Sequence, residues 1–206
     1  MIRLALPTDG ERLAEIYAPA VVGSAISFEL EPPDGAEMAR RIGDVVARTP
    51  WLVCERDGIV VGYAYAGRFR ERAAYQWSVE VSAYVAREAQ SRGVGRALYT
   101  SLFAMLAVQG FRNAYAGVAL PNDASIALHR EVGFTPVGVY REVGYKLDTW
   151  HDVAWFERAL APRVVHPQPP RLLPELLGDG ALLDAMQAGA PLLRIGERSA
   201  ADTRSA

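Results

Sequence analysis

The sequence predicts a fold of the mixed α/β (α+β) class, because an antiparallel hairpin and a strand–helix–strand unit occur in one chain. Asp57-Gly58 lies between two apolar runs and is a strong signal for a tight hairpin. Between Trp77 and Val118, a strand, a glycine-rich turn, a helix and a second strand follow one another. Half of the residues are hydrophobic, which is enough to cover both faces of a sheet.

The N-terminal part predicts one strand and two helices. Ile2 to Leu6 has the composition of a short strand. Thr8, followed three residues later by Glu11, predicts a capping box at the start of the first helix. Asp34 also has a glutamate three residues later, and it predicts the start of a second helix that continues to about Val46.

The rest of the chain to residue 160 alternates strands and helices. Apolar residues at helical spacing from Val94 predict a helix that ends at Gly110. A short helix is expected from Ser125 to Glu131, closed by Gly133. Apolar and β-branched runs predict six further strands, at residues 51–55, 59–66, 75–85, 114–118, 137–143 and 153–160.

The composition changes after Leu160, which suggests a domain over residues 1–160 and an extension over 161–206. Five prolines occur between residues 162 and 174, and leucine doublets follow. The role of this extension is not predicted by its sequence. Its last residues, Ser199 to Ala206, are small and polar, and we expect them to be frayed.

Charge and cysteine content exclude several classes of protein. The net charge of −2 gives no electrostatic basis for binding nucleic acid or an anionic membrane. No apolar run approaches the roughly 20 residues of a membrane span, and proline interrupts the N-terminus too early for a signal peptide. Cys54 is the only cysteine, as is typical of a reducing compartment. We expect a cytoplasmic protein.

The glycine-rich turn Gln90-Ser91-Arg92-Gly93-Val94-Gly95-Arg96 is the most informative motif. Turns of this kind open a helix and direct several backbone N–H groups at one point, where the helix dipole adds partial positive charge. Glycine lets an anionic group approach the backbone closely. Many Gly-x-Gly pairs are only turns, but here a strand, a basic turn and a helix follow without a break.

Several motifs in this order resemble the GNAT superfamily of acyl-CoA-dependent N-acyltransferases. The glycine turn matches the superfamily's Gln/Arg-x-x-Gly-x-Gly/Ala motif, and the segment from Asn122 to Gly133-Phe134 matches its Asn…Gly-Phe segment. The segments that resemble the phosphinothricin and methionine sulfoximine N-acetyltransferases are Pro50-Trp51-Leu52-Val53, Tyr63-Ala64-Tyr65-Ala66-Gly67, Leu120-Pro121-Asn122-Asp123, Arg141-Glu142-Val143-Gly144-Tyr145-Lys146 and Trp150-His151-Asp152-Val153. The resemblance covers Ile2 to about Leu160. It implies a mostly antiparallel central sheet that splays at the cofactor site and is flanked by helices.

The resemblance implies acetyl-CoA as the co-substrate. Its pyrophosphate would bind the amides of the glycine turn, and its pantetheine arm would pair with the strand before the turn. The implied cofactor-binding residues are Ala83, Tyr84, Val85, Gln90, Ser91, Arg92, Gly93, Val94, Gly95, Arg96, Asn122 and Ser125. No metal is expected, because the three histidines lack metal-ligand spacing with any cysteine.

Acyl transfer to an amine needs a base for the ammonium and an acid for the leaving thiolate. Glu80 lies in the apolar strand segment Trp77 to Val81, where burial should raise the pKa of its carboxyl toward that of a useful base. The matching glutamate is the superfamily's proposed base. His129 matches the position at which phosphinothricin-type members carry histidine as the acid. The alternatives are a solvent-facing glutamate and a structural histidine.

The acceptor side is predicted from a charged loop. Arg70 and Arg72 precede Tyr75 and Trp77, and guanidinium groups beside aromatic rings suit carboxylate and phosphinyl or sulfonyl oxygens. The resemblance also implies Phe28 as a substrate contact. The alternatives are a solvated loop for the arginines and a core position for Phe28.

We therefore expect an acetyl-CoA-dependent N-acetyltransferase. It would acetylate the α-amino group of a small amino-acid analogue, namely phosphinothricin, methionine sulfoximine or methionine sulfone, by direct transfer in a ternary complex. Two alternatives remain: an acetyltransferase for a protein N-terminus or polyamine, and a non-catalytic acetyl-CoA-binding module. Family members are often dimers, and the leucine doublets offer apolar surface for a homodimer. Cys54 lies away from the motifs and is expected to be a core residue.

Overall fold

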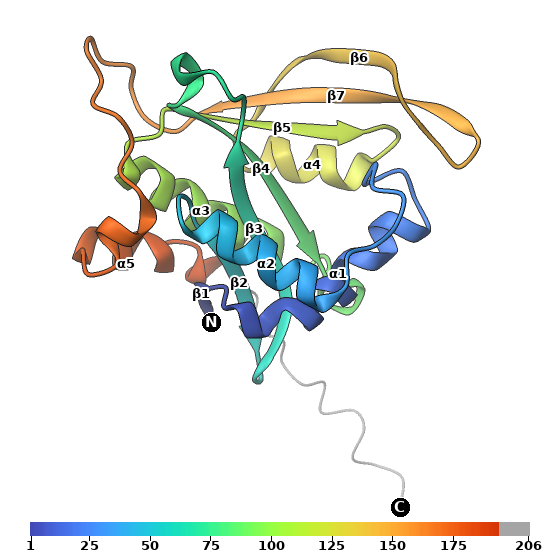
Figure 1. Ribbon diagram of the computed structural model, residues 1–206, viewed down its shortest axis with the longest axis horizontal. Coiled ribbons are helices and arrows are strands. Elements are labelled where there is room, and N and C mark those ends of the chain that lie inside the picture. The colour runs from blue at the N-terminus through green and yellow to red at the C-terminus, as the bar shows by residue number, and fades with distance from the viewer. Residues whose placement is uncertain (194–206) are drawn as a thin grey trace, which may run out of the picture.

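A computed structural model describes residues 1–193 and contains one seven-stranded sheet in the order β1-β2-β3-β4-β5-β7-β6 (Figure 1). The strands are β1 (Ile2–Leu4), β2 (Trp51–Arg56), β3 (Ile59–Arg68), β4 (Ser78–Val85), β5 (Asn113–Ala119), β6 (Thr135–Lys146) and β7 (Thr149–Ala159). The helices are α1 (Gly10–Val22), α2 (Gly35–Val46), α3 (Val94–Gln109), α4 (Asp123–Glu131) and α5 (Gly180–Gln187). The mixed α/β class expected from the sequence is confirmed.

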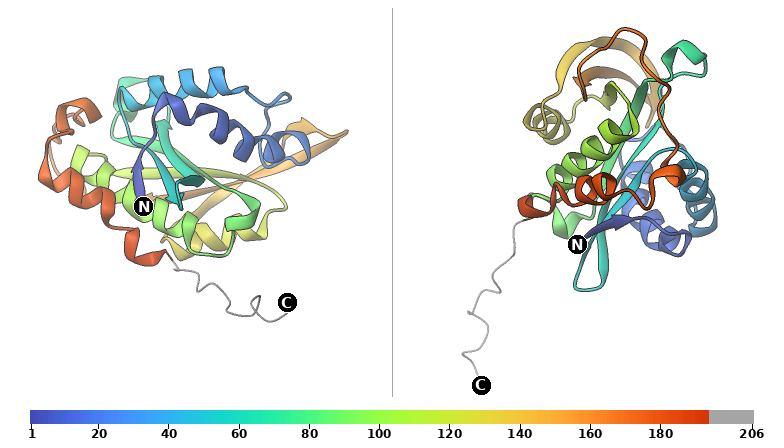
Figure 2. Two further views of the ribbon diagram at one scale, coloured as in Figure 1. Left: turned by 90° about the horizontal axis from the view of Figure 1, so that it is seen from below. Right: turned by 90° about the vertical axis from the view of Figure 1, so that its left-hand side faces the viewer.

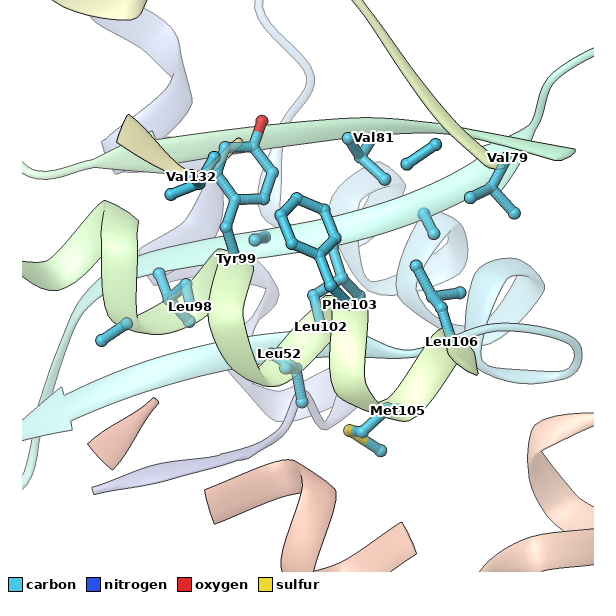
Figure 3. Close-up of a cluster of buried hydrophobic side chains, with 14 of the residues drawn as sticks. Leu52, Val79, Val81, Leu98, Tyr99, Leu102, Phe103, Met105, Leu106 and Val132 are labelled. Carbon is cyan, nitrogen blue, oxygen red and sulfur yellow. The ribbon is translucent and has the colours of Figure 1, made fainter. Parts of the chain in front are cut away.

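Helices cover both faces of the sheet. Figure 2 shows α1 and α2 on one face and α3, α4 and α5 on the other. The α3 face holds the larger core, in which Leu98, Leu102 and Leu106 pack against Val79 and Val81 of β4 (Figure 3). Alternate side chains of a strand point to opposite faces. Residues of β4 at even positions, including residue 80, therefore face the α1–α2 side.

One strand pair positions the site. Every neighbouring pair in the sheet is antiparallel except β4 and β5, which are parallel. These two strands pair only from Ser78 to Glu80 and from Asn113 to Tyr115. Beyond Glu80, the side of β4 that faces β5 has no strand partner among residues 1–193. The sheet therefore opens between the two strands, as the resemblance implies.

Most local predictions are confirmed. Asp57 and Gly58 both have positive φ, 51° and 77°, as a two-residue hairpin turn requires. The Asp34 side chain accepts a hydrogen bond from the amide of Glu37 and caps α2. Gly110 has a φ of 102° and ends α3. Turn and cap chemistry is local, and for this reason the sequence alone predicts it well.

Two local predictions are wrong. Thr8 does not cap the first helix, because Asp9 follows it and binds Arg3 and the amide of Leu6, and a short 3₁₀ turn (Pro7–Asp9) precedes α1. The strand expected from residue 75 begins only at Ser78, because residues 73–75 form a 3₁₀ turn. Both errors arise where a short turn interrupts an apparent pattern.

The C-terminal extension packs on the same core as the preceding residues. Leu173, Leu176, Leu182 and Ala185 are buried in the cluster around α3. The leucine doublets offer only part of the apolar surface expected from them, since the doublets 176–177 and 182–183 each bury one leucine and expose the other. The frayed end expected over residues 199–206 lies outside the described residues.

Candidate active site

Helix α3 begins at a turn whose backbone amides receive no side-chain cap from the residues that the structure describes. Gly93 and Ser91 both adopt positive φ, 80° and 58°. Asp34, Asn122 and Asp179 cap the helices that follow them, whereas α3 has neither a side-chain cap nor an acidic residue in its first turn. The first amides of a helix have no partner within the helix, so these amides are available to an anionic group.

The side chains of the glycine turn have different roles. The Gln90 side-chain amide donates to the carbonyl of Val85 at 3.2 Å and ties the turn to the end of β4. Arg92 is exposed at the turn. Arg96 forms an ion pair with Glu131 of α4 at 2.8 Å, so its charge is partly compensated. Of the two arginines, Arg92 is therefore better placed to meet a phosphate group.

Gly95 lies where α3 approaches α4. A Cβ at this position would come within 3.0 Å of a Leu128 side-chain carbon. The glycine thus permits close packing between the two helices that border the opening, besides leaving backbone exposed.

A hollow follows the opening between β4 and β5. Its walls come from Ala83 and Tyr84 of β4, residues 117–119 of β5, and Asn122 and Ser125 at the start of α4. The Asn122 side-chain oxygen accepts from the Ser125 amide at 3.1 Å and caps α4. The structure thus brings together the residues predicted to hold the pantetheine arm, and strand pairing to β3 holds the other edge of β4.

His129 lines the same hollow and is buried. Its Nδ1 lies 2.7 Å from the carbonyl oxygen of Ser125, which requires a proton on Nδ1, and its Nε2 lies 3.2 Å from the Tyr99 hydroxyl. Burial lowers the pKa of His129, and the bond to Ser125 opposes this effect. Burial also raises the pKa of Tyr99. The result is a desolvated imidazole–phenol pair.

Glu80 lies on the opposite face of β4, half buried between Gly67 of β3 and Tyr115 of β5. Burial raises the pKa of its carboxyl above the ordinary value, and the positive charge of Arg70 opposes the increase. This is the direction expected for a base. The opening between the strands gives access from the His129 side of the sheet to the Glu80 side.

The two arginines of the charged loop have different surroundings. The Arg70 guanidinium lies over the Phe69 ring at 4.4 Å and is 5.9 Å from the Trp155 ring. Its positive charge also lowers the pKa of Glu80 against the larger effect of burial. Arg72 is exposed. Both line a hollow of about 480 Å³ between this loop and the C-terminal end of α2, together with Arg48. Arg70 is therefore the arginine associated with Glu80.

The three aromatic residues predicted on the acceptor side contact three different parts of the fold. Tyr75 packs edge-on against Phe69 with ring centroids 5.9 Å apart. The Trp77 indole N–H donates to the carbonyl of Gln168 in the C-terminal extension at 2.9 Å. The Phe28 ring packs against the β6–β7 hairpin at Gly144, where an added Cβ would overlap it.

Sequence reasoning missed two polar groups of this region. Tyr99 occupies an apolar stripe of α3, so its hydroxyl beside His129 has no signal in the sequence. Tyr65 is opposite Ser82 on β4, and their side chains are hydrogen-bonded. The motif Tyr63-Ala64-Tyr65 had drawn attention to this strand, but only pairing with β4 places the Tyr65 hydroxyl near Glu80.

Cys54 is fully buried in the core, and burial raises the pKa of its thiol. Within residues 1–193 there is no cluster of histidine, cysteine and acidic side chains suited to a metal ion. No helix in that range is long and apolar enough to cross a membrane.

The candidate site thus combines an uncapped helix start at the opening of a splayed sheet with the buried imidazole of His129 on one side and the half-buried carboxyl of Glu80 on the other, an arrangement suited to acyl transfer. Residues 2–155 match the acetyltransferase (GNAT) domain. The chain belongs to this family.

Known relatives agree with this assignment. The chain is 39% identical over 170 residues to phosphinothricin N-acetyltransferase of Streptomyces viridochromogenes, covering 81% of this chain and 93% of that protein. It is 33% identical over 163 residues to the L-methionine sulfoximine/L-methionine sulfone acetyltransferase of Salmonella typhimurium, and the match covers 77% of this chain and 94% of that protein. The chain superimposes with a TM-score of 0.76 on a crystal structure of a phosphinothricin acetyltransferase from Sinorhizobium meliloti in complex with AcCoA. The sequence identity is 34%, and the match covers 84% of this chain and 97% of that chain.

Proposed function

We propose that this enzyme transfers the acetyl group of acetyl-CoA to the α-amino group of phosphinothricin, methionine sulfoximine or methionine sulfone. The names of the relatives in Streptomyces and Salmonella support this acceptor class. The observation that carries the proposal is the opening between β4 and β5, which has the uncapped start of α3 on one side and Glu80 beside Arg70 on the other.

Transfer is direct in this proposal. Glu80 takes a proton from the ammonium of the acceptor, directly or through water, and the amine nitrogen attacks the thioester carbonyl. A backbone N–H near Val85 stabilises the oxyanion. The C–S bond then breaks, His129 gives a proton to the leaving thiolate, and the nitrogen releases its second proton to water as the amide forms. The lowered pKa of His129 makes its protonated form a stronger acid. Cys54 is buried in the core and is not needed as an acyl carrier.

Arg70 favours an anionic acceptor over a polyamine. Its guanidinium beside Glu80 suits a carboxylate, and the Phe69 and Trp155 rings suit the apolar part of a side chain. A polyamine site is expected to have acidic groups in this position instead. The retention of both Glu80 and His129 favours an enzyme over a non-catalytic acetyl-CoA-binding module.

A thiol-release assay with acetyl-CoA and a panel of acceptors tests the proposal. The panel includes the three named analogues, ordinary L-amino acids, a polyamine and a peptide with a free N-terminus. Rapid release of thiol with at least one analogue is the expected result. Turnover of the peptide or the polyamine alone would contradict the acceptor class, and no turnover with any amine would favour a binding module.

We also propose a homodimer formed through the β6–β7 hairpin. Strand β6 is at the edge of the sheet, so in the described part of the chain one side of its backbone has no strand partner. Seven large apolar side chains of the hairpin are between 39% and 59% exposed, at positions 137, 139, 140, 143, 145, 147 and 150. An unpaired edge strand with apolar side chains is a template for a second strand, and a two-fold contact would place β6 against its copy.

Light scattering in solution tests the assembly. Val143→Glu, in the hairpin, is expected to convert the dimer to a monomer. Leu177→Glu places the same charge on an exposed leucine of the C-terminal extension and is expected to leave the dimer intact. A monomeric wild-type protein, or dissociation by Leu177→Glu alone, would contradict this assembly.

A further inference from the structure

The chain contains one lysine, Lys146, among 21 arginines. Lys146 is at the end of β6 and is only 6% exposed, whereas most arginines of the described residues lie on the surface. A buried ammonium is costly unless its protons are hydrogen-bonded. The hydrogen bonds of the Lys146 ammonium must therefore compensate for its burial.

The Lys146 ammonium donates to two backbone carbonyls on one other segment. Nζ lies 2.5 Å from the oxygen of Val21 and 2.7 Å from the oxygen of Ser27. Within residues 1–193 it forms no ion pair with a carboxylate. Val21 is in the last turn of α1, where carbonyls lack a helical partner and the helix dipole is negative. Lys146 thus caps α1 from another part of the fold.

The segment that Lys146 binds leads into the connection between α1 and α2, residues 23–34. The Ser27 hydroxyl is 2.6 Å from the Tyr17 hydroxyl, which also donates to Glu29 at 2.9 Å. Arg41 of α2 forms an ion pair with the same Glu29 at 2.7 Å. These contacts fix one side of the connection to the helices, and Lys146 fixes it to the hairpin.

The connection reaches the hollow of the candidate site and the β6–β7 hairpin. Ile26 lines the hollow that contains His129, and Phe28 packs against Gly144 of the hairpin. Tyr17, which holds Ser27, packs edge-on against Tyr84 of β4 with ring centroids 4.8 Å apart. A shift of the connection would therefore change the surface over the opening between β4 and β5.

We propose that Lys146 is a positioning residue that holds the α1–α2 connection over the acetyl-transfer site. The inference rests on the proposed function for its kinetic consequence only. Lysine suits this role better than arginine, because a compact ammonium can donate to two carbonyls in different directions, whereas a planar guanidinium needs more room.

Lys146→Met tests the proposal, because methionine keeps much of the volume and removes the donors. The matched control is Arg141→Met, which removes a cation from the same strand. Arg141 is 76% exposed and binds Asp152 rather than the α1–α2 connection. In Lys146→Met, we expect the acceptor KM to rise about tenfold or more while the acetyl-CoA KM stays within about threefold. Lys146→Arg should restore only part of the loss.

Hydrogen exchange measured on peptides separates positioning from activity. The Ser27 amide donates to the carbonyl of Ala20, so a peptide that includes it reports on the connection. Lys146→Met should speed exchange there by about tenfold or more and leave α3 unchanged. Arg141→Met should leave both unchanged. Unaltered exchange in the connection, or equal losses in all peptides, would overturn the proposal.

Amine labelling of the wild type tests the same contact without any substitution. Because the chain has one lysine, an N-hydroxysuccinimide ester modifies a single side-chain amine besides the N-terminus. Labelling of Lys146 in the native protein should be at least about tenfold slower than in the urea-denatured chain. Equal rates would overturn the proposal even if Lys146→Met failed to fold. A wild type that lacks acetyl transfer but passes the exchange and labelling tests would refute the proposed function and leave the positioning role standing.

Discussion

At the scale of single residues, burial shifts the pKa values of Glu80 and His129 in opposite directions, as the proposed roles of base and acid require. Burial raises the pKa of the Glu80 carboxyl, which makes it a better base, and lowers the pKa of His129, which makes its protonated form a better acid. They lie on opposite sides of the sheet, Glu80 on β4 and His129 on α4. In the proposed mechanism, the opening beside β4 lets both residues act on one bound acetyl group.

The charge of Arg70 should be visible in the pH dependence of catalysis. Arg70 lowers the pKa of Glu80 against the larger effect of burial, so Arg70→Ala should raise that pKa further. A base acts when deprotonated, and the acidic limb of the kcat/KM profile should therefore move to higher pH. An acidic limb that Arg70→Ala leaves in place would contradict the pairing of these two residues.

In Glu80→Gln, kcat/KM should fall by about 10² or more near neutral pH, because the variant has no carboxylate to accept the proton.

His129→Ala should lower kcat and leave acetyl-CoA affinity nearly unchanged, because the proposed proton transfer occurs as the thiolate departs. Tyr99→Phe removes only the hydroxyl beside Nε2 and should cause a smaller loss. Steady-state kinetics and calorimetry measure the two quantities separately. Loss of acetyl-CoA binding with kcat preserved would instead assign His129 to cofactor positioning.

At the scale of elements, the start of α3 and the start of α4 form one unit. The first supplies uncapped amides and the second supplies Asn122, Ser125 and His129. The two helices approach each other closely at Gly95 and Leu128, and the Arg96–Glu131 ion pair joins them again. The geometry of the cofactor site thus depends on how these two helices pack.

Gly95→Val tests this unit. The added branch would press on Leu128 and also obstruct the approach to the amides, so acetyl-CoA affinity should fall by roughly tenfold or more, about 1.4 kcal/mol per factor of ten. Gly43→Val is a matched control, since a Cβ at that helical glycine would meet no atom within 4 Å. Calorimetry measures both variants. Equal affinity in wild type and Gly95→Val would assign the turn a structural role only.

At the scale of the whole molecule, the C-terminal extension is built into the core on the α3 side. The buried Ser101 hydroxyl accepts from the amide of Gly189 at 3.0 Å, and the Gln187 side chain donates to the carbonyl of Ile2. The Gln109 side chain binds the carbonyls of Arg48 and Arg171. The extension therefore joins α3 to the first strand and to the end of α2.

Gly189→Ala should destabilise the protein, because a Cβ there would overlap the backbone of Ala97 in α3. Overpacking of this kind costs about 1–3 kcal/mol. Gly178→Ala is the control, since a Cβ at that position meets nothing nearby. Urea unfolding measures both. If Gly189→Ala unfolded like the wild type, the extension would contribute little to the stability of the domain.

The sequence by itself determined what is local or repeated along the chain. The Asp57-Gly58 hairpin, the cap at Asp34, the glycine turn before α3 and the class of fold all follow from short-range backbone chemistry and side-chain spacing. The separated motifs from residue 50 to residue 153 also indicated the family, because their order is far more specific than the glycine turn alone.

Only the tertiary structure decided which distant groups meet. It placed Arg70, and not Arg72, beside Glu80, and it brought the Tyr99 hydroxyl to His129. It also buried one leucine of each of the doublets 176–177 and 182–183 in the core around α3. It also placed the only lysine on the carbonyls of Val21 and Ser27, more than 100 residues away. Such contacts depend on strand order and helix packing, and no short-range pattern encodes the partner of a buried polar group.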